Sequence, residues 1–352
     1  MPLKVGLTYN LRKPQQIGES TPEDFYIEFD TEDTVNAIGN ALNKAGCKVI
    51  KIEADEKAYY KLKRTKPDIV FNIAEGLRGE SRESHIPIML EILGIPYVGS
   101  GPLSLAISLN KALTHQLLRF NGVSSPSFQL FNHADEPIDV DLTFPFVVKP
   151  ISEGSSKGIR NSSLVKDEPS LRQQVSWVNK NYDQAAIVEE FLPGREFTVG
   201  LIGNDDLMVL PIVEILIAKL PSGVSPLYSY EAKWIWDVPE KPLDIFTCPA
   251  DVDENLENEI RHIAVKTFRL LNCRDFCRID LRLDTNNKPH VLEVNPIPGL
   301  LPNPKAHSCL PEAARAAGFT YDQLICTILW KALHRYNMQY LLASPSLIKS
   351  SP

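Results

Sequence analysis

The chain has 352 residues, which is enough for two or three domains with a large hydrophobic core. Apolar residues make up 43% of the sequence and charged residues 23%, as in ordinary water-soluble globular proteins. The net charge of −7 argues against a nucleic acid or an anionic membrane as the main partner. The most apolar run, 207–218, is too short to span a bilayer, and no export signal is visible. We therefore expect a cytoplasmic protein.

The first 120 residues alternate strand-like apolar runs with amphipathic segments typical of helices. This βαβ alternation predicts a parallel sheet covered by helices. In the first helix, Thr31 or Asp33 can cap the start, and Gly46 can end it. The expected strands are 4–9, 47–52 and 68–73, and the expected helices are 33–45, 83–93 and 104–120.

A second pattern begins near residue 124, and from residue 196 onward most of the sequence predicts antiparallel strands. A Gly/Ser-rich loop follows the first strand of this part, and a loop rich in Ser, Pro and Tyr interrupts the later strands. The expected strands are 146–149 and 185–192, the helices are 170–178, 254–271 and 310–336, and the loops are 153–158 and 222–242.

The six cysteines and seven histidines form no recognisable metal or catalytic pattern. Cys273 and Cys277 lie close together, but no second pair or histidine cluster completes a zinc site. Most cysteines have apolar neighbours, so we expect buried free thiols in a reducing compartment. The histidines include no HExxH motif and no obvious partner for a nucleophile, so catalysis by histidine is not expected.

The segment 276–302 reads as two short strands joined by a polar turn. Because side chains alternate along a strand, Asp280 falls on the same face as Arg278. Glu293 and Asn295 share a face of the second strand, so a hairpin can bring them to Asp280. Two carboxylates and an amide oxygen suit Mg²⁺, and Mg²⁺ here suggests phosphates. The alternative is a solvated hairpin with its charges on the outer face.

Other segments have chemistry suited to phosphates or a nucleotide. Lys149 ends a strand, and the small residues after it have backbone N–H groups that can close over an anion. Glu189 and Glu196 flank an apolar turn that can contact an adenine. Lys233 lies in an aromatic-rich loop, and the turn at Gly299 can direct backbone N–H groups at a developing oxyanion. The structural alternatives are a flexible Gly/Ser hairpin, a charged strand end and a surface loop.

These segments form an ordered series of motifs. They are GSGP…NK at 99–111, VVKPISEGSSKG at 147–158, VEEFLPGREFTV at 188–199, YSYEAKW at 228–234, CRIDLRLD at 277–284 and LEVNPIPGL at 292–300. In this order, over residues 4–332, the chain resembles the ATP-grasp superfamily and, within it, the D-alanine–D-alanine ligase family.

The resemblance implies an α/β fold with α+β elements, namely an ATP-grasp fold with an N-terminal Rossmann-like pre-ATP-grasp domain. That domain would cover 1–110, a central lid 111–195, and a C-terminal subdomain with the metal hairpin 196–336. ATP would lie between the last two. The end of the chain, 337–352, is expected to be a disordered tail.

The resemblance also assigns residues to the nucleotide. Two lysines would hold it and its phosphates, and a third, on the closing loop, would reach the γ-phosphate. A carboxylate and two backbone groups would read the adenine, and a second carboxylate would read the ribose. The first two lysines are Lys111 and Lys149, and the third is Lys233. Glu189 and the backbone of Glu190 and Leu192 would read the adenine, and Glu196 would read the ribose.

A second implied set carries the chemistry. Arg278 and the backbone of Gly299 would stabilise a tetrahedral intermediate, with Lys233 at the γ-phosphate. Ser155 matches a serine that the family links to the first-substrate site. Two Mg²⁺ ions, with Mn²⁺ as an alternative, would be bound by Asp280, Glu293 and Asn295.

The implied reaction is ATP-dependent amide formation between two amino acids or similar small molecules. A carboxylate attacks the γ-phosphorus of ATP, and the amine of a second substrate then attacks the acylphosphate. Closure of the 222–242 loop would exclude water. Two other functions stay open: a nucleotide-binding homologue without catalysis, and an ATP-grasp enzyme with a different acceptor nucleophile. The resemblance alone implies a homodimer, and neither nucleic acid nor membrane is an expected partner.

Several departures from the family pattern fall at the amino-acid positions. The family binds the first substrate's ammonium with a glutamate after the first strand, but none is found at 10–13. Arg12 and Lys13 there are either contacts for an acidic substrate or exposed cations. Trp234 replaces a tyrosine and lacks its hydroxyl. The sequence Pro304-Lys305 stands where a serine–leucine pair holds the second carboxylate, and its lysine can replace them as a point charge. These differences argue against D-alanine at both positions.

Overall fold

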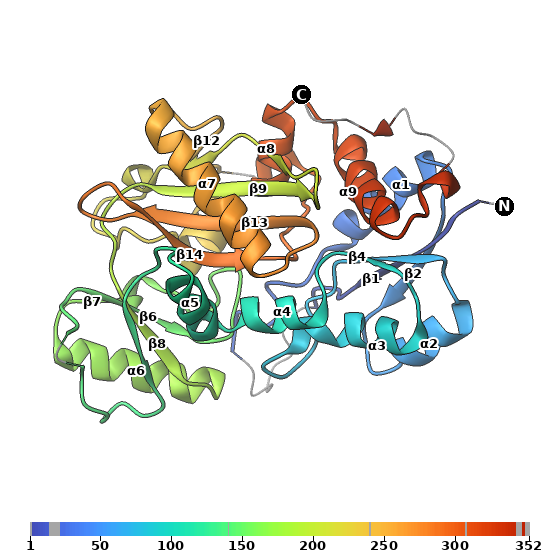
Figure 1. The fold of residues 1–352 in the computed structure, drawn as a ribbon. Coiled ribbons are helices and arrows are strands. Elements are labelled where there is room, and N and C mark those ends of the chain that lie inside the picture. The colour runs from blue at the N-terminus through green and yellow to red at the C-terminus, as the bar shows by residue number, and fades with distance from the viewer. Residues whose placement is uncertain are drawn as a thin grey trace.

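The computed structural model describes residues 2–13, 22–139, 141–238, 241–306, 308–342 and 347–348. Three sheets, each covered by helices, build the molecule (Figure 1). Across these residues, no helix is long and apolar enough to cross a membrane.

The first sheet is parallel, with the order β2-β1-β3-β4, as the βαβ pattern predicted. Thr31 caps the first helix by accepting a hydrogen bond from the Thr34 backbone N–H. Gly46, with φ of +85°, follows the end of that helix. The strands are β1 (Lys4–Tyr9), β2 (Lys48–Glu53), β3 (Ile69–Asn72) and β4 (Tyr97–Val98). The helices are α1 (Glu32–Lys44), α2 (Ala58–Thr65), which the sequence did not predict, and α3 (His85–Leu93).

The single helix predicted over 104–120 is wrong. The structure has two helices, α4 (Pro102–Leu109) and α5 (Lys111–Phe120), separated by Asn110. Asn110 has an extended backbone, and its side chain caps α5 by accepting the Leu113 N–H at 3.0 Å. Asparagine favours such a cap over a helix interior. Lys111 is therefore the first residue of a helix rather than a mid-helix residue.

The second sheet is antiparallel, with the order β5-β8-β6-β7, and α6 packs on it. Its apolar side chains and those of α6 form a separate core cluster. α6 extends well beyond the predicted 170–178, because Asp167 caps it upstream and accepts the Ser170 N–H. The elements are β5 (Phe128–Phe131), β6 (Phe146–Pro150), β7 (Leu164–Val165), α6 (Glu168–Tyr182) and β8 (Ala186–Glu190).

The third sheet is antiparallel, with the order β12-β11-β9-β13-β14 and with β10 paired to β9. The helical region predicted over 310–336 contains two helices, separated by a turn with Gly318 at φ +77°. The strands are β9 (Glu196–Gly203), β10 (Met208–Val209), β11 (Val213–Ile215), β12 (Phe246–Thr247), β13 (Asp275–Leu283) and β14 (Pro289–Asn295). The helices are α7 (Glu254–Leu270), α8 (Cys309–Ala316) and α9 (Tyr321–Arg335).

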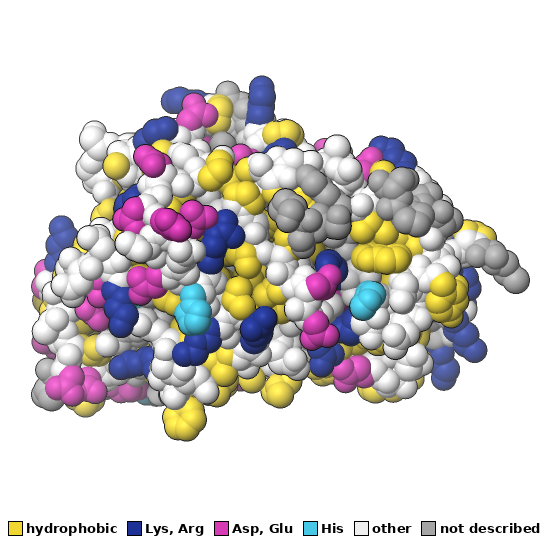
Figure 2. All heavy atoms as spheres, turned by 45° about the horizontal axis from the view of Figure 1, so that its top comes forward, with side chains coloured by type: hydrophobic (Ala, Val, Ile, Leu, Met, Phe, Trp, Pro, Cys, Tyr) yellow, Lys and Arg dark blue, Asp and Glu magenta, His cyan; other side chains and the backbone are white. Residues whose placement is uncertain are grey.

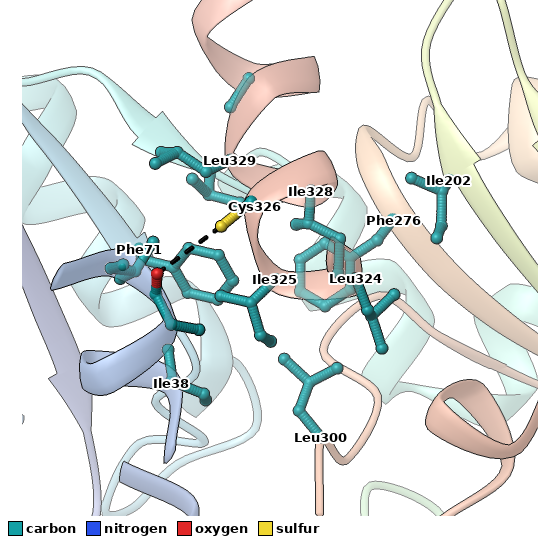
Figure 3. Packing of buried hydrophobic residues seen from close by; sticks show 14 of the residues in the cluster. Ile38, Phe71, Ile202, Phe276, Leu300, Leu324, Ile325, Cys326, Ile328 and Leu329 are labelled. Atoms are coloured by element: carbon teal, nitrogen blue, oxygen red, sulfur yellow. Dashed lines mark hydrogen bonds between the residues drawn. The ribbon is translucent and has the colours of Figure 1, made fainter. Parts of the chain in front are cut away.

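A single core cluster joins the first and third sheets. Phe71 of β3 and Phe276 of β13 lie with ring centroids 6.4 Å apart. Ile325 and Ile328 of α9 belong to the same cluster, as Figure 3 shows. α9 also packs against α1, and the Cys326 thiol lies 3.6 Å from the Ala41 carbonyl oxygen. The N-terminal and C-terminal parts of the chain are therefore packed together.

The domain limits remain a prediction, and two observations bear on them. α5 falls in the predicted lid, yet its Leu118 packs into the core of the third sheet. The tail was predicted to be disordered, but Gln339–Leu341 forms a short 3₁₀ helix, and Leu342 is buried. Leu347 and Ile348 are partly buried against the core. Residues 343–346 and 349–352 lie outside the described residues.

The distribution of surface charge and the state of the cysteines agree with what the sequence predicted. On the face in Figure 2, basic and acidic side chains are interspersed rather than gathered by sign. All six cysteines are free; Cys248 and Cys309 are partly exposed, and the other four are buried. The expectation of free thiols is confirmed.

Candidate active site

A cavity of about 210 Å³ lies between the three sheets. Ten of the thirteen residues predicted to form a site line it, although they come from distant parts of the chain. They are Lys111, Lys149, Ser155, Glu196, Lys233, Arg278, Asp280, Glu293, Asn295 and Gly299. Glu189, Glu190 and Leu192 do not line the cavity.

The hairpin of β13 and β14 brings the predicted metal ligands together. Asp280 lies opposite Glu293, and a bulge directly after this pair shifts the register. The Asn295 amide donates to Asp280 Oδ2 at 3.0 Å. Arg278 Nη2 lies 2.8 Å from Asp280 Oδ2, and Lys111 Nζ lies 2.8 Å from Glu293 Oε1. Each carboxylate is therefore paired with one cation.

This donor set fits Mg²⁺ as an ion shared with a phosphate substrate. Mg²⁺ in such sites commonly has one or two carboxylate ligands plus phosphate oxygens and waters. No cluster of three His, Cys, Asp or Glu side chains able to hold a metal occurs in the described part of the chain. A purely protein-made cage is therefore not indicated, whereas a site completed by phosphate oxygens is compatible with Asp280, Glu293 and Asn295.

Lys233 and Arg278 place two positive charges at one point of the cavity. Lys233 lies on a π-helical turn, Ala232–Trp236, and its ammonium forms no ion pair with any described residue. Burial and the nearby Arg278 lower the pKa of Lys233. Arg278 is paired with Asp280, whereas Lys233 has no ion-pair partner among the described residues, so its ammonium is suited to an anion.

The aromatic-rich loop is docked on the Gly/Ser loop of the second sheet. Tyr230 N–H donates to the Ile159 carbonyl at 2.7 Å, and the Ser156 hydroxyl donates to the Tyr228 carbonyl at 3.0 Å. The Trp234 indole N–H donates to the Ser155 carbonyl at 3.0 Å. The missing tyrosine hydroxyl is thus replaced by an indole donor that joins the two loops over the cavity.

Replacing Trp234 with Phe should loosen this closure. The variant keeps the aromatic ring but loses the N–H donor, so in the reaction that the resemblance implies, water should reach the acylphosphate more often. We expect ADP to form with less amide per ADP, by about 3-fold or more, since one hydrogen bond contributes roughly 1 kcal/mol. Parallel assays of ADP and amide measure this ratio. Tight coupling in Trp234→Phe would contradict the assigned role, and Trp236→Phe is the matched control.

The Glu189 side chain, which was predicted to read the adenine, is held by two protein groups. Glu189 is 1% exposed and accepts from Lys149 Nζ at 2.5 Å, with His115 Nε2 at 3.2 Å. Burial alone would raise the pKa of Glu189, but Lys149 and His115 lower it to about 2. Glu190 is exposed, and its N–H donates to Ser127. The Glu189 side chain therefore positions the Lys149 ammonium and does not itself line the cavity.

Glu196, the predicted ribose ligand, is held by a residue that was not given a role. Arg282 Nη1 lies 3.0 Å from Glu196 Oε2, and its Nη2 donates to the Pro226 carbonyl at 2.9 Å. The arginine also stacks 5.0 Å from the Phe191 ring. Arg282 thereby connects β9, the 222–242 loop and the turn at Phe191. Its role could have been predicted from strand alternation, which puts it on the same face as Asp280.

A glutamate from outside residues 10–13 does reach the cavity beside Ser155. Glu28 lines the cavity, and its Oε1 accepts the Gly154 N–H at 2.7 Å beside Ser155. It lies well past 10–13, where none was found. Arg12 also lines the cavity, but it donates to the Ile27 and Phe29 carbonyls and so holds this segment in place. Lys13 is exposed.

The expectation that Lys305 holds the second carboxylate is not supported by its position. Lys305 is exposed and does not line the cavity. Ser308 does line it, is 8% exposed, and donates its hydroxyl to the Gly299 carbonyl at 2.7 Å. Cys309 follows as the first residue of α8. The signal in the sequence was a serine followed by an apolar residue at the start of a helix. It lies several residues beyond Pro304-Lys305, where it was expected.

Comparison with known proteins gives the same family over most of the chain. The model for the D-ala D-ala ligase C-terminus matches residues 114–330. A D-alanine–D-alanine ligase from Pelotomaculum thermopropionicum is 33% identical over 83% of this chain and 88% of its own. An uncharacterised Sinorhizobium fredii protein, y4sG, is 40% identical over 84% of this chain and 86% of its own.

Solved structures show the same fold. The ATP complex of a Bacillus anthracis D-alanine–D-alanine ligase has a TM-score of 0.70 and 23% identity, covering 95% of this chain and 99% of its own. A D-Ala:D-Ser ligase from Enterococcus faecalis has a TM-score of 0.69 and 22% identity, covering 94% and 100%. The predicted ATP-grasp fold is confirmed. The chain belongs to the D-alanine–D-alanine ligase family and is an ATP-dependent ligase that forms an amide bond.

Proposed function

We propose that this cavity joins two amino-acid-like substrates, with the first activated at the hairpin of β13 and β14. The observation that carries this proposal is the grouping of Lys233 and Arg278 with Asp280, Glu293 and Asn295. The cations supply an anion site, and the oxygen donors supply ligands for two Mg²⁺ or Mn²⁺ ions. Such ions would neutralise the charge of the transferring phosphoryl group.

The first step is attack by the first substrate's carboxylate oxygen on the γ-phosphorus of ATP, which releases ADP. Lys111 and Lys149 hold the nucleotide and its phosphates, and Lys233 follows the γ-phosphoryl group as charge builds on its oxygens. Glu196 reads the ribose, and backbone groups of Glu190 and Leu192 read the adenine. Glu189 acts here through Lys149, which it orients.

The second step is attack by the amine of the second substrate on the acylphosphate carbonyl. Arg278 and the Gly299 N–H stabilise the tetrahedral oxyanion, and phosphate leaves as the amide forms. Ser308 and the start of α8 lie beside Gly299 and receive the second substrate's carboxylate. Ser155 and Trp234 keep the two loops closed, so that water does not compete.

A screen of amino-acid pairs tests this function. Purified protein with ATP and Mg²⁺ should release ADP and phosphate in equal amounts with a new amide, and only when a suitable pair is present. ADP release without an amine acceptor would instead indicate a different acceptor nucleophile. No turnover with any pair would favour a nucleotide-binding homologue without catalysis. Lys233 argues against that outcome, because it forms no ion pair with any described residue and its pKa is lowered, a cost that anion binding offsets.

A further inference from the structure

Two carboxylates at the first-substrate end of the cavity have no partner. Glu75 and Glu83 both line the cavity, and Glu83 is only 9% exposed. Neither carboxylate makes a hydrogen bond or an ion pair with any described residue, whereas buried charges in proteins are normally paired. These side chains therefore point to a ligand with complementary charge.

Their position follows from the loop after β3. Parallel sheets bind ligands at the carboxyl ends of their strands, and Glu75 lies just beyond such an end. Gly76 has φ of +82°, and a Cβ there would lie 2.2 Å from the Arg82 carbonyl oxygen. Its N–H donates to Asn10 at 2.9 Å. This tight folding of the loop brings Glu83 back to the same cavity as Glu75.

Glu28 is not available as the receptor for a substrate cation. Its Oε1 accepts the Gly154 N–H, and its Oε2 lies 3.1 Å from both Arg82 Nη2 and Lys157 Nζ. Glu153 pairs with the same two cations. Two carboxylates and two cations thus balance each other at this edge of the cavity. Glu28 is therefore already paired with protein groups.

The other charged groups around this end of the cavity leave Glu75 and Glu83 without an ion-pair partner among the described residues. The Arg12 guanidinium acts on Asp30, whose pKa burial raises to about 7. Arg82 acts on Glu75 and Glu83, and Lys111 on Glu83, without forming an ion pair with them, because Arg82 is directed at Glu28, Glu153 and the Ser152 carbonyl. Burial and neighbouring carboxylates raise the pKa of Glu75 well above its ordinary value. Burial also raises the pKa of Glu83, to about 8. A raised pKa favours the neutral carboxyl in the empty cavity, so a bound cationic ligand is what holds both groups ionised.

We propose that the first substrate is an amino acid with a second cationic group, and that Glu75 and Glu83 receive its two positive charges. This inference rests on the proposed function, because it names the substrate that the hairpin activates. An amino acid with one ammonium and an apolar side chain would satisfy only one of the two carboxylates. A dicationic amino acid satisfies both and leaves its α-carboxylate free to be phosphorylated.

The test compares ornithine with norvaline, which has the same carbon chain without the side-chain ammonium. Each is supplied in both enantiomers as first substrate, with ATP, Mg²⁺ and a pool of amine acceptors. We expect kcat/KM for ornithine to exceed that for norvaline by at least about 10-fold, the size of one charge-assisted hydrogen bond. The same ratio should fall about 10-fold in Glu83→Gln and in Glu75→Gln. It should stay unchanged in Glu80→Gln, an exposed glutamate on the same loop.

Binding gives a readout that does not depend on turnover. Trp234 lines the cavity, so its fluorescence can report amino-acid binding to the protein loaded with a non-hydrolysable ATP analogue and Mg²⁺. Tighter binding of ornithine than of norvaline, lost in Glu83→Gln, supports the inference even if no acceptor is found. Equal binding and equal turnover of the two amino acids would overturn it and leave the ligase function intact. Absence of turnover with every pair counts against the proposed function instead.

Discussion

Glu293→Gln should reduce turnover by at least about 100-fold while leaving the fold intact. The amide is a weaker ligand for Mg²⁺ than the carboxylate, and it leaves Lys111 without its counter-ion at 2.8 Å. The Mg²⁺ concentration for half-maximal rate should rise about 10-fold or more. Steady-state ADP release over a Mg²⁺ titration measures both effects, and circular dichroism checks the fold.

Asp284→Asn is the matched control for this variant. Asp284 lies in the turn of the same hairpin and accepts N–H groups from Asn286 and Lys288, away from the cavity. Its neutralisation should leave the Mg²⁺ dependence unchanged. Near-normal turnover of Glu293→Gln at ordinary Mg²⁺ concentrations would remove Glu293 from the metal site.

Lys233→Met should lower kcat by about 100-fold to 1,000-fold, as loss of one preorganised donor at a developing charge does. The ammonium forms no ion pair with the described residues and lies beside Arg278. Its loss therefore relieves repulsion between like charges, and thermal stability should be unchanged or higher. A variant that loses activity and stability together would show that Lys233 holds the loop in place rather than acting on phosphate.

The pH dependence of kcat gives a second test of Lys233. Because burial and Arg278 lower the pKa of this lysine, its ammonium loses its proton at a lower pH than an ordinary lysine. The wild-type rate should fall on the alkaline side before the ordinary lysine range near 10.4, and this limb should vanish in Lys233→Met. Lys219→Met, where an exposed lysine donates to the Asp244 carbonyl, should keep the wild-type profile.

Local motifs were read correctly from the sequence because each depends on short-range geometry. The hairpin register follows from strand alternation, and the structure places Asp280 opposite Glu293. The break at Asn110 was missed because no glycine or proline interrupts residues 103–120, and only the asparagine cap reveals two helices. Similarly, α2 was missed: it is a short helix with a lysine-rich sequence.

The amino-acid end of the site could not be read in the same way. Glu28, Glu75 and Glu83 reach the cavity from segments with no motif of their own, and only the packing of three sheets brings them together. Ser308 was missed because it follows Gly299 by nine residues, beyond the Pro304-Lys305 position where a contact for the second carboxylate was expected. Specificity in this fold depends on such loop lengths, which sequence spacing alone does not determine.

The shared core of the first and third sheets has a mechanical consequence. The core that α9 shares with both sheets holds two parts of the site together. One is the loop with Glu75 and Glu83, and the other is the hairpin with Asp280 and Glu293. The second sheet has a core of its own. It is nevertheless tied to that loop, because Arg82, next to Glu83, pairs with Glu153 and donates to the Ser152 carbonyl. A movement of the second sheet that opened the cavity would have to break these contacts, so nucleotide exchange is coupled to the loop that recognises the first substrate.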